Sequence, residues 1–281
     1  MNTAWLFPGQ ASQKVGMGHD LYQNTELGKS YFDLANSIMD CDIQSIIFEG
    51  PRKTLKQTQY TQPAIYIVSV IIGKLLLKKG LRPAALAGHS LGEYSALAIG
   101  EAFDFATGLN LVKLRAENMA QAGRIQSGSM AAIIGLDEYR VIDLCQDYAG
   151  EGIVVAANFN SPGQVVISGT PEAVTTIMAT AKSNGARMAT QLNVSGAFHS
   201  TLMAPAREAL AVELNSIQIS DSNYPIYANV NAQPNTLGVK IKDLLIRQLD
   251  NPVLWSQTIT CLLYTSPSPR DLSTARMPSS A

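Results

Sequence analysis

Apolar residues along this chain fall into short runs that end in turn residues and longer stretches with a helical spacing. The short runs predict buried strands at residues 3–7, 84–87 and 226–229. Apolar positions at helical intervals predict helices over residues 27–39, 62–77, 93–99, 106–119, 202–214 and 241–249. Strands that alternate with helices favour an α/β fold whose parallel sheet is covered by helices on both faces.

A different pattern interrupts this alternation between residues 126 and 194. Strands are predicted at 130–135, 154–158, 165–168 and 188–194, and helices at 138–148 and 171–184. The order β-α-β-β-α-β is that of a ferredoxin-like α+β unit. We therefore expect a catalytic core made of residues 1–125 and 195–260, with residues 126–194 inserted as a small subdomain.

Residues 261–281 break from the composition of the rest and read CLLYTSPSPRDLSTARMPSSA. A disordered terminus would have this Ser- and Pro-rich composition. The segment also resembles the translation of a sequencing-library adapter, and so long a match is more specific than any short motif. We interpret residues 261–281 as adapter read-through that is not native. The fold is then expected to end near Thr260.

Composition narrows the class of protein. The chain has 281 residues, of which 46% are hydrophobic and 15% charged, which excludes a disordered chain. The net charge of −1 argues against a general nucleic-acid binder. Three cysteines lack zinc-site spacing, the first residues do not form a signal peptide, and the apolar stretch 64–77 is too short for a membrane span. We expect a cytoplasmic enzyme that binds neither membranes nor nucleic acid.

The sharpest motif is Gly-His-Ser-Leu-Gly at residues 88–92, which follows a predicted strand and precedes a predicted helix. This context is typical of a nucleophile elbow, in which a strained turn presents the Ser90 hydroxyl above the sheet edge. The Leu91 N–H, at the helix N-terminus, would face a developing oxyanion. A structural Gly-Ser turn is the alternative.

A neutral serine needs a base, and the chain has three histidines. His89 neighbours Ser90 and would point away from it, so we interpret it as a buried, hydrogen-bonded spacer. His19 lies early in the chain, where a helix cap or loop residue is expected. His199, where the insert returns to the core, is the predicted base. No Asp or Glu between Gly92 and His199 sits where a hydrolase acid would, so a carbonyl would have to orient the base.

Two further features complete the candidate site. The loop after the first strand, Phe-Pro-Gly-Gln at residues 7–10, lies beside the elbow in a parallel sheet, so the Gln10 N–H is a candidate second oxyanion donor. An ordinary turn is the alternative. Arg115 interrupts an otherwise apolar helix. Its guanidinium either snorkels to solvent or binds a substrate carboxylate.

Together these segments resemble the malonyl-CoA:acyl-carrier-protein transacylases of bacterial fatty acid synthesis. The matching segments, in order, are FPGQASQKVGMG (7–18), TQPAI (61–65), GHSLGEYSAL (88–97), LVKLRAENM (111–119), GSMAAIIGL (128–136), NFNSPGQVVISG (158–169), VSGAFHSTLM (194–203) and RQLDNPVLW (247–255). The resemblance implies an α/β-hydrolase-like core with a ferredoxin-like insert. It also implies that the segment after residue 260 departs from the family, whose members continue through a further part of the core sheet.

The resemblance implies a ping-pong reaction. Ser90 attacks the thioester of malonyl-CoA with His199 as its base, and the malonyl-serine ester then passes to the phosphopantetheine thiol of holo acyl carrier protein. The N–H groups of Gln10 and Leu91 form the oxyanion hole, and Arg115 pairs with the free carboxylate.

The resemblance implies two further roles. The main chain of Gln248 orients His199, and Phe198 crowds a 2-methyl branch. No cofactor and no metal are implied, and we expect a monomer.

Two alternatives remain open. A serine esterase or thioesterase would use the same elbow with water as acceptor, but it would need an acid after the elbow and has no use for Arg115. A non-catalytic docking module is the other.

Because carrier proteins of this pathway are acidic, we expect a basic patch near the mouth of the Ser90 site, with Lys182 and Arg187 as candidates.

Overall fold

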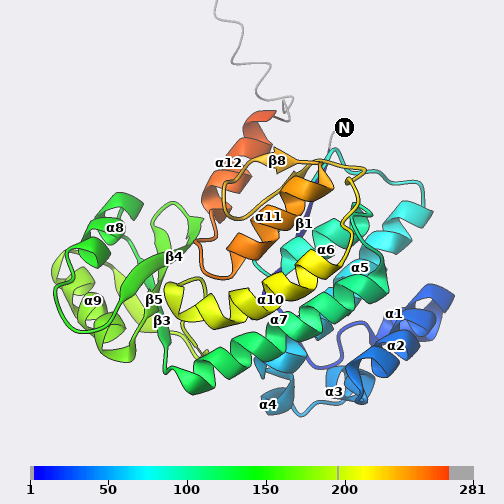
Figure 1. Cartoon of the computed structure of the whole chain (residues 1–281), viewed down its shortest axis with the longest axis horizontal. Helices are drawn as coiled ribbons and strands as arrows, with labels where there is room; N and C mark the ends of the chain where they lie inside the picture. The colour runs from blue at the N-terminus through cyan, green and yellow to red at the C-terminus, as the bar shows by residue number, and fades with distance from the viewer. Residues whose placement is uncertain (1–2, 195, 266–281) are drawn as a thin grey trace, which may run out of the picture.

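Two four-stranded sheets organise the computed structural model, which describes residues 3–194 and 196–265 (Figure 1). The first sheet has the order β1-β2-β7-β8, with β1 Ala4–Phe7, β2 Ala85–Gly88, β7 Ile226–Tyr227 and β8 Pro234–Asn235. Strands β1, β2 and β7 are parallel, as predicted, whereas β8 is antiparallel to β7. The prediction of a purely parallel sheet was therefore wrong at this edge, because the chain turns back over residues 228–233 and pairs beside β7.

Helices cover this sheet and join it to the rest of the chain. Those that pack around the first sheet and the elbow are α5 Thr58–Lys78, α6 Gly92–Ile99, α7 Phe105–Ile125 and α10 Ala204–Ser216. Helix α7 packs against both α5 and α10, and α6 packs against β1 and β2. Helix α5 is long and apolar enough to cross a membrane, but most of its apolar window is buried inside the protein, as expected of a core helix. It begins at Thr58, four residues before the predicted start.

Further helices flank this layer. They are α1 His19–Asn24, α2 Glu26–Met39, α3 Ile43–Phe48, α4 Arg52–Leu55, the 3₁₀ helix η1 Thr201–Met203, α11 Gly238–Gln248 and α12 Trp255–Thr265. Residues 261–265 continue α12, and Leu262 is buried against Ala85 and Tyr227 of the first sheet. Residues 266–281 lie outside the described residues, so the adapter interpretation of the C-terminal segment stays a prediction.

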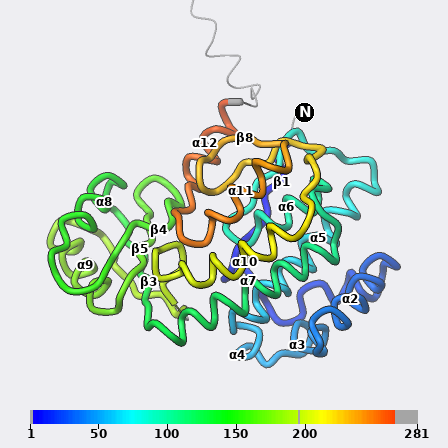
Figure 2. The backbone as a smooth tube through the Cα atoms, in the orientation of Figure 1, coloured from blue at the N-terminus to red at the C-terminus, as the bar shows by residue number. Residues whose placement is uncertain are grey.

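The second sheet forms a separate lobe between residues 129 and 191, visible at the left of Figure 2. Its elements are β3 Ser129–Ile134, α8 Glu138–Gln146, β4 Val154–Ser161, β5 Gln164–Gly169, α9 Pro171–Ser183 and β6 Met188–Gln191. The strand order is β4-β5-β3-β6 and every neighbouring pair is antiparallel. The β-α-β-β-α-β order of elements is as predicted.

Side chains that alternate along β3 divide the lobe into two faces. Ala131 and Ile133 join the core beneath α8 and α9, whereas Met130 and Ala132 turn toward the main body. A parallel bridge between Asn158 of β4 and Val253 ties the lobe to the segment before α12. The second face of the lobe is therefore free to form one wall of a cavity.

Candidate active site

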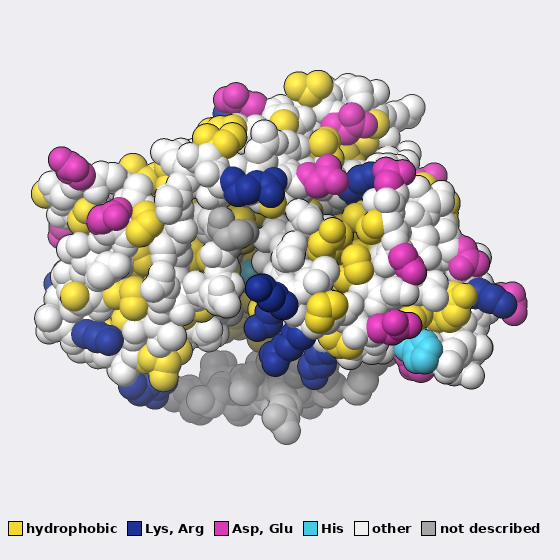
Figure 3. All heavy atoms as spheres, turned by 90° about the horizontal axis from the view of Figure 1, so that it is seen from below, with side chains coloured by type: hydrophobic (Ala, Val, Ile, Leu, Met, Phe, Trp, Pro, Cys, Tyr) yellow, Lys and Arg dark blue, Asp and Glu magenta, His cyan; other side chains and the backbone are white. Residues whose placement is uncertain are grey.

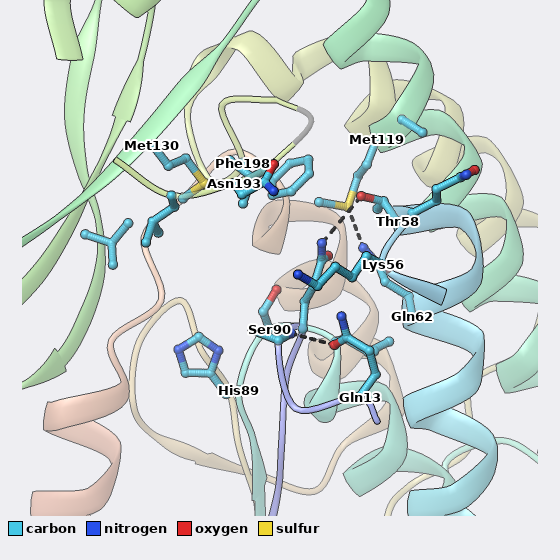
Figure 4. Close-up of a pocket in the computed structure, with 18 of the residues that line it drawn as sticks. Gln13, Lys56, Thr58, Gln62, His89, Ser90, Met119, Met130, Asn193 and Phe198 are labelled. Atoms are coloured by element: carbon cyan, nitrogen blue, oxygen red, sulfur yellow. Dashed lines mark hydrogen bonds between the residues drawn. The ribbon is translucent and has the colours of Figure 1, made fainter. Parts of the chain in front are cut away.

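A cavity of about 930 Å³ lies between the main body and the second sheet. Its size is that of a site for a small molecule or a cofactor-sized ligand. Six of the residues predicted for the site line it, namely Gln10, Ser90, Leu91, Arg115, Phe198 and His199. Figure 4 shows Ser90 with His89 on one side of this cavity, Met130 and Phe198 opposite, and Gln62 and Met119 on the helical wall.

The elbow that carries Ser90 depends on two glycines that let strand and helix approach closely. A Cβ at Gly88 would lie 1.9 Å from the Gly92 carbonyl carbon, and one at Gly92 would lie 2.2 Å from the Phe7 oxygen. Ser90 itself has a φ of 50°, in the left-handed region that non-glycine residues rarely adopt. Such strain, about 1–3 kcal/mol, is kept where the surroundings hold the residue in place.

Asn229, two residues after the end of β7, supplies that support. Its Oδ1 accepts a hydrogen bond from the Ser90 N–H at 2.6 Å, and its Nδ2 donates to the Gly88 carbonyl at 2.7 Å. Asn229 is fully buried, so both bonds are protected from water. The side chain therefore clamps both sides of the strained turn. Asn229 was not among the predicted site residues, although its place at the end of a predicted core strand was a signal.

Ser90 and His199 are hydrogen-bonded across the cavity. Ser90 Oγ lies 2.8 Å from His199 Nε2, and His199 Nδ1 lies 2.9 Å from the carbonyl oxygen of Gln248 and 3.2 Å from that of Asn251. Carbonyls only accept, so Nδ1 must carry the proton and Nε2 is left as the acceptor. Ser90 Oγ therefore donates to His199, in the geometry of a nucleophile beside a general base.

Burial keeps His199 neutral. It is 3% exposed, and desolvation, aided by the positive charge of Arg115, lowers the pKa of its imidazole to about 3. The carbonyls of Gln248 and Asn251 act in the opposite direction. A neutral imidazole is the form that accepts a proton from a serine hydroxyl.

Arg115 is fully buried beside the same hydroxyl. Its Nη2 donates to Ser90 Oγ and to Gln248 Oε1, at 3.0 Å each, and its Nη1 donates to Gln62 Oε1. The snorkelling alternative is wrong, because the guanidinium does not reach solvent. Within the part of the chain that the structure describes, its Nε has no hydrogen-bond partner. The Cζ atom of the guanidinium lies over the Tyr94 ring, 5.5 Å from its centroid.

No carboxylate is in hydrogen-bond contact with this cation among the described residues. Two glutamine amides, Gln62 and Gln248, hold it instead, and Gln62 also donates to the Met119 sulfur at 3.4 Å. A buried guanidinium with neutral partners and an unused N–H keeps capacity for an anion that enters the cavity. Gln62, missed as a site residue, stands in the TQPAI segment noted above.

Two residues that line the cavity carry backbone N–H groups that could stabilise an oxyanion. Among the described residues, neither the Gln10 nor the Leu91 N–H donates a hydrogen bond to another group of the chain. Gln10 follows β1 and Leu91 caps α6, and both line the cavity with Ser90. Paired N–H donors beside a nucleophile are the arrangement that stabilises an oxyanion.

Glu93 is a buried acidic residue that is hydrogen-bonded to this network, and it was not among the predicted site residues. It is 2% exposed, and burial raises the pKa of its carboxyl to about 7. Its Oε2 accepts hydrogen bonds from Gln248 Nε2 and the Asn229 N–H rather than from His199. It is therefore not the acid of a hydrolase triad.

The remaining predicted residues lie around the cavity. Phe198 is 6% exposed and forms part of the wall. His89, a partly buried residue, hydrogen-bonds Asn160 at 2.9 Å and meets the edge of Trp255, as expected for a spacer. His19 begins α1, remote from the elbow in sequence, and its ring contacts Phe48.

Basic side chains gather beside the cavity mouth, where Figure 3 shows Lys and Arg next to the central hollow. Those that line the cavity are Arg52, Lys53, Lys56 and Arg124. The two predicted candidates lie elsewhere, Lys182 in the last turn of α9 and Arg187 at a smaller hollow beside Gly135. Over the described residues, no group of His, Cys, Asp and Glu is arranged to hold a metal ion.

Fold and site together define an acyltransferase. The family model for the acyl transferase domain matches residues 4–269, and the chain belongs to that family.

Individual relatives carry more specific names. The malonyl CoA-acyl carrier protein transacylase of Synechocystis is 43% identical over 262 residues, covering 93% of this chain and 86% of its own. The crystal structure of an acyl carrier protein S-malonyltransferase from Vibrio cholerae has a TM-score of 0.91 at 41% identity, covering 94% and 87%. A malonyl-transacylase solved in complex with a type II PKS acyl-carrier protein has a TM-score of 0.90 at 38% identity, covering 94% and 86%.

Proposed function

We propose that the protein transfers a malonyl group from malonyl-CoA to the phosphopantetheine thiol of holo acyl carrier protein, in two half-reactions through a malonyl ester of Ser90. One observation carries this proposal. The Ser90 hydroxyl donates to the neutral base His199 and accepts from the buried cation Arg115. A base activates the nucleophile, and the cation selects an acyl group with a free carboxylate.

The first half-reaction begins at Ser90 Oγ, which attacks the thioester carbonyl carbon while its proton passes to His199 Nε2. The carbonyl π electrons move to oxygen, and the unpartnered N–H groups of Gln10 and Leu91 stabilise that oxyanion. The carbon–sulfur bond then breaks as the oxyanion collapses. His199 returns the proton to the departing thiolate, so CoA leaves as a thiol and the malonyl-Ser90 ester remains.

The second half-reaction runs the same steps in reverse with a different thiol. The phosphopantetheine thiol gives its proton to His199 and attacks the ester carbonyl, and Ser90 leaves with that proton. Throughout, the Gln248 and Asn251 carbonyls hold the Nδ1–H, so that Nε2 stays aimed at Ser90. The relative solved with a bound acyl-carrier protein supports this class of partner.

The acyl group is selected at Arg115. A malonyl carboxylate fits the unused donor capacity of the guanidinium, and a bound carboxylate supplies the counter-charge that its neutral partners lack. Phe198, which directly precedes the base, limits the room beside the malonyl methylene. A 2-methyl branch would meet this ring.

The proposal extends to the architecture and setting of the chain. Residues 1–125 and 195–260 form an α/β-hydrolase-like core, supported by the strand-elbow-helix unit at Ser90. Residues 126–194 form a ferredoxin-like insert, supported by its strand order and antiparallel pairing. The enzyme acts as a monomer in the cytoplasm, and the steps above use no cofactor.

Intact-protein mass spectrometry tests the proposal directly. The chain is mixed with malonyl-CoA, beside a Ser90→Ala control and a circular-dichroism check of folding. We expect one malonyl group on the wild type alone, discharged when holo acyl carrier protein is added. A folded wild type that takes up no malonyl group would refute the mechanism. Discharge by water as fast as by the carrier protein would identify a thioesterase instead.

A further inference from the structure

Glu93 is a buried carboxyl group that the proposed reaction steps do not use. It lies in the first turn of α6, three residues after the nucleophile, and its side chain bonds to neither Ser90 Oγ nor His199. Glu93 is 2% exposed, and burying an ionisable side chain costs free energy unless hydrogen bonds compensate for the lost water. The hydrogen-bond partners of Glu93 therefore indicate its role.

Two N–H groups from different parts of the chain converge on one carboxyl oxygen. Glu93 Oε2 accepts from Gln248 Nε2 at 2.7 Å and from the Asn229 backbone N–H at 3.1 Å. Gln248 is the last residue of α11, and Asn229 follows β7. Glu93 thus joins three elements at a point directly beneath the elbow.

The bond to Gln248 fixes which way its side-chain amide faces. Gln248 Nε2 also donates to the Ser90 carbonyl at 3.0 Å, while Oε1 accepts from Arg115 Nη2 at 3.0 Å. A flipped amide would turn N–H groups toward the guanidinium and an oxygen toward the Glu93 oxygen. Both contacts would then be repulsive, so an acceptor at Glu93 enforces the orientation that holds Arg115.

The bond to Asn229 holds the turn that carries Ser90. The Asn229 backbone N–H donates to Glu93, while the Asn229 side chain bridges the Ser90 N–H and the Gly88 carbonyl. One carboxyl oxygen therefore positions both the cation and the strained nucleophile. A shift of either by about 1 Å is enough to slow an oriented reaction about a hundredfold.

We propose that Glu93 is a positioning residue that sets acyl selectivity, by fixing the Gln248 amide so that Arg115 lies where a malonyl carboxylate binds. The inference rests on the proposed malonyl transfer and deepens it. Its physical basis is the reach of a hydrogen-bond acceptor to Gln248 and Asn229. A carboxylate at residue 93 that did not reach Gln248 Nε2 would not orient the Gln248 side-chain amide.

Two substitutions separate reach from charge. Glu93→Gln keeps the length of the side chain and one acceptor oxygen but removes the charge. Glu93→Asp keeps the charge but withdraws the acceptor by one methylene. Ser95→Ala is the matched control, because Ser95 is buried in the same helix and its Oγ has no partner among the described residues. Initial rates of acyl-enzyme formation are measured with malonyl-CoA and acetyl-CoA by intact-protein mass spectrometry.

We expect the malonyl-to-acetyl rate ratio of E93Q and S95A to stay within about threefold of wild type, and that of E93D to fall about tenfold or more. A purely structural role would lower the melting temperature and leave this ratio unchanged. An unchanged ratio in folded E93D, or a ratio in E93Q that falls as far, overturns the inference. If E93D does not fold, Gln248→Met removes the same link from its other end, and an unchanged ratio there is equally decisive. A wild type that takes up no malonyl group overturns the proposed function itself.

Discussion

The Nη2 atom of Arg115 lies 3.0 Å from the Oγ atom of Ser90, so the buried cation and the nucleophile share one end of the cavity. In a malonyl thioester, one methylene separates the free carboxylate from the reacting carbonyl. An acyl group of that length reaches the cation while its carbonyl lies at the nucleophile. An acetyl group reaches the nucleophile but has no carboxylate to pair with the cation.

Replacing Arg115 is therefore expected to change selectivity more than general reactivity. Arg115→Met removes the cation, and we expect malonyl loading to fall about a hundredfold or more, with acetyl loading changed less than about tenfold. Intact-protein mass spectrometry with each CoA thioester measures both rates. The control is Arg82→Met, since the exposed Arg82 donates to the Leu77 and Leu81 carbonyls and does not line the cavity. An equal fall for both thioesters would contradict the assignment.

The sequence predicted the elements whose pattern is long or sharply bounded. The elbow between β2 and α6 was predicted because its motif places two glycines around a serine, between a strand and a helix. Only glycine fits at residues 88 and 92, since a Cβ at either position would clash with nearby backbone atoms. The short helices α1, α3 and α4 and the edge strand β8 were missed, and each is six residues or fewer, too short to show a period against loop sequence. Helix α12, with 11 residues, was missed as well, because its second half lies in the segment that was interpreted as adapter read-through.

The site was predictable where chemistry restricts the residue type, and hidden where contacts across the fold decide the role. Three histidines made the search for a base short, so His199 was found. Asn229, Glu93 and Gln62 act through partners that are 53 to 155 residues away in the sequence, and nothing local marks them. For Arg115 the sequence left two interpretations open, a guanidinium that snorkels to solvent and one that binds an anion. Only its burial in the folded structure decides between them.

The pKa of His199 predicts how stability depends on pH. Its pKa is about 3 in the folded state and about 6.5 when unfolded, so below about pH 6.5 the unfolded chain binds a proton that the folded chain does not. The stability contributed by neutral His199 is thus present above about pH 6.5 and lost as the pH falls toward about 3. The loss is at most about 1.4 kcal/mol per pH unit.

Urea unfolding of wild type and His199→Gln at pH 7.5 and pH 5 measures this contribution. We expect the free energy of unfolding to fall further in the wild type than in the variant. Glu93 has a raised pKa and acts in the opposite direction between about pH 4.5 and 7, but it is present in both proteins and cancels in the difference. Equal falls in the two proteins would show that His199 titrates normally in the folded state.

The basic residues at the cavity mouth predict a salt-dependent step with the carrier protein. Reversing two of them, in a Lys53→Glu, Lys56→Glu variant, should raise the KM for holo acyl carrier protein about tenfold at low salt and weaken its dependence on ionic strength. Loading from malonyl-N-acetylcysteamine, which carries no phosphate, should be unchanged. Lys79→Glu, at the opposite end of α5 from the cavity, is the matched control. A KM that does not move would place the docking surface elsewhere.

Phe198 predicts the discrimination between malonyl and methylmalonyl groups. Its ring lines the cavity directly before the base, so Phe198→Val should open room for a 2-methyl branch. One methyl group in an apolar pocket is worth roughly ten- to a hundredfold in rate, and we expect the methylmalonyl-to-malonyl loading ratio to rise within that range.

Phe103→Val is the control, because Phe103 is also 6% exposed but belongs to the core and does not line the cavity. Both variants should lose stability from the cavity each creates, by less than the roughly 3–5 kcal/mol of a Phe→Ala change. Only Phe198→Val should change the ratio, and a similar change in both would trace the discrimination to loosened packing rather than to this ring.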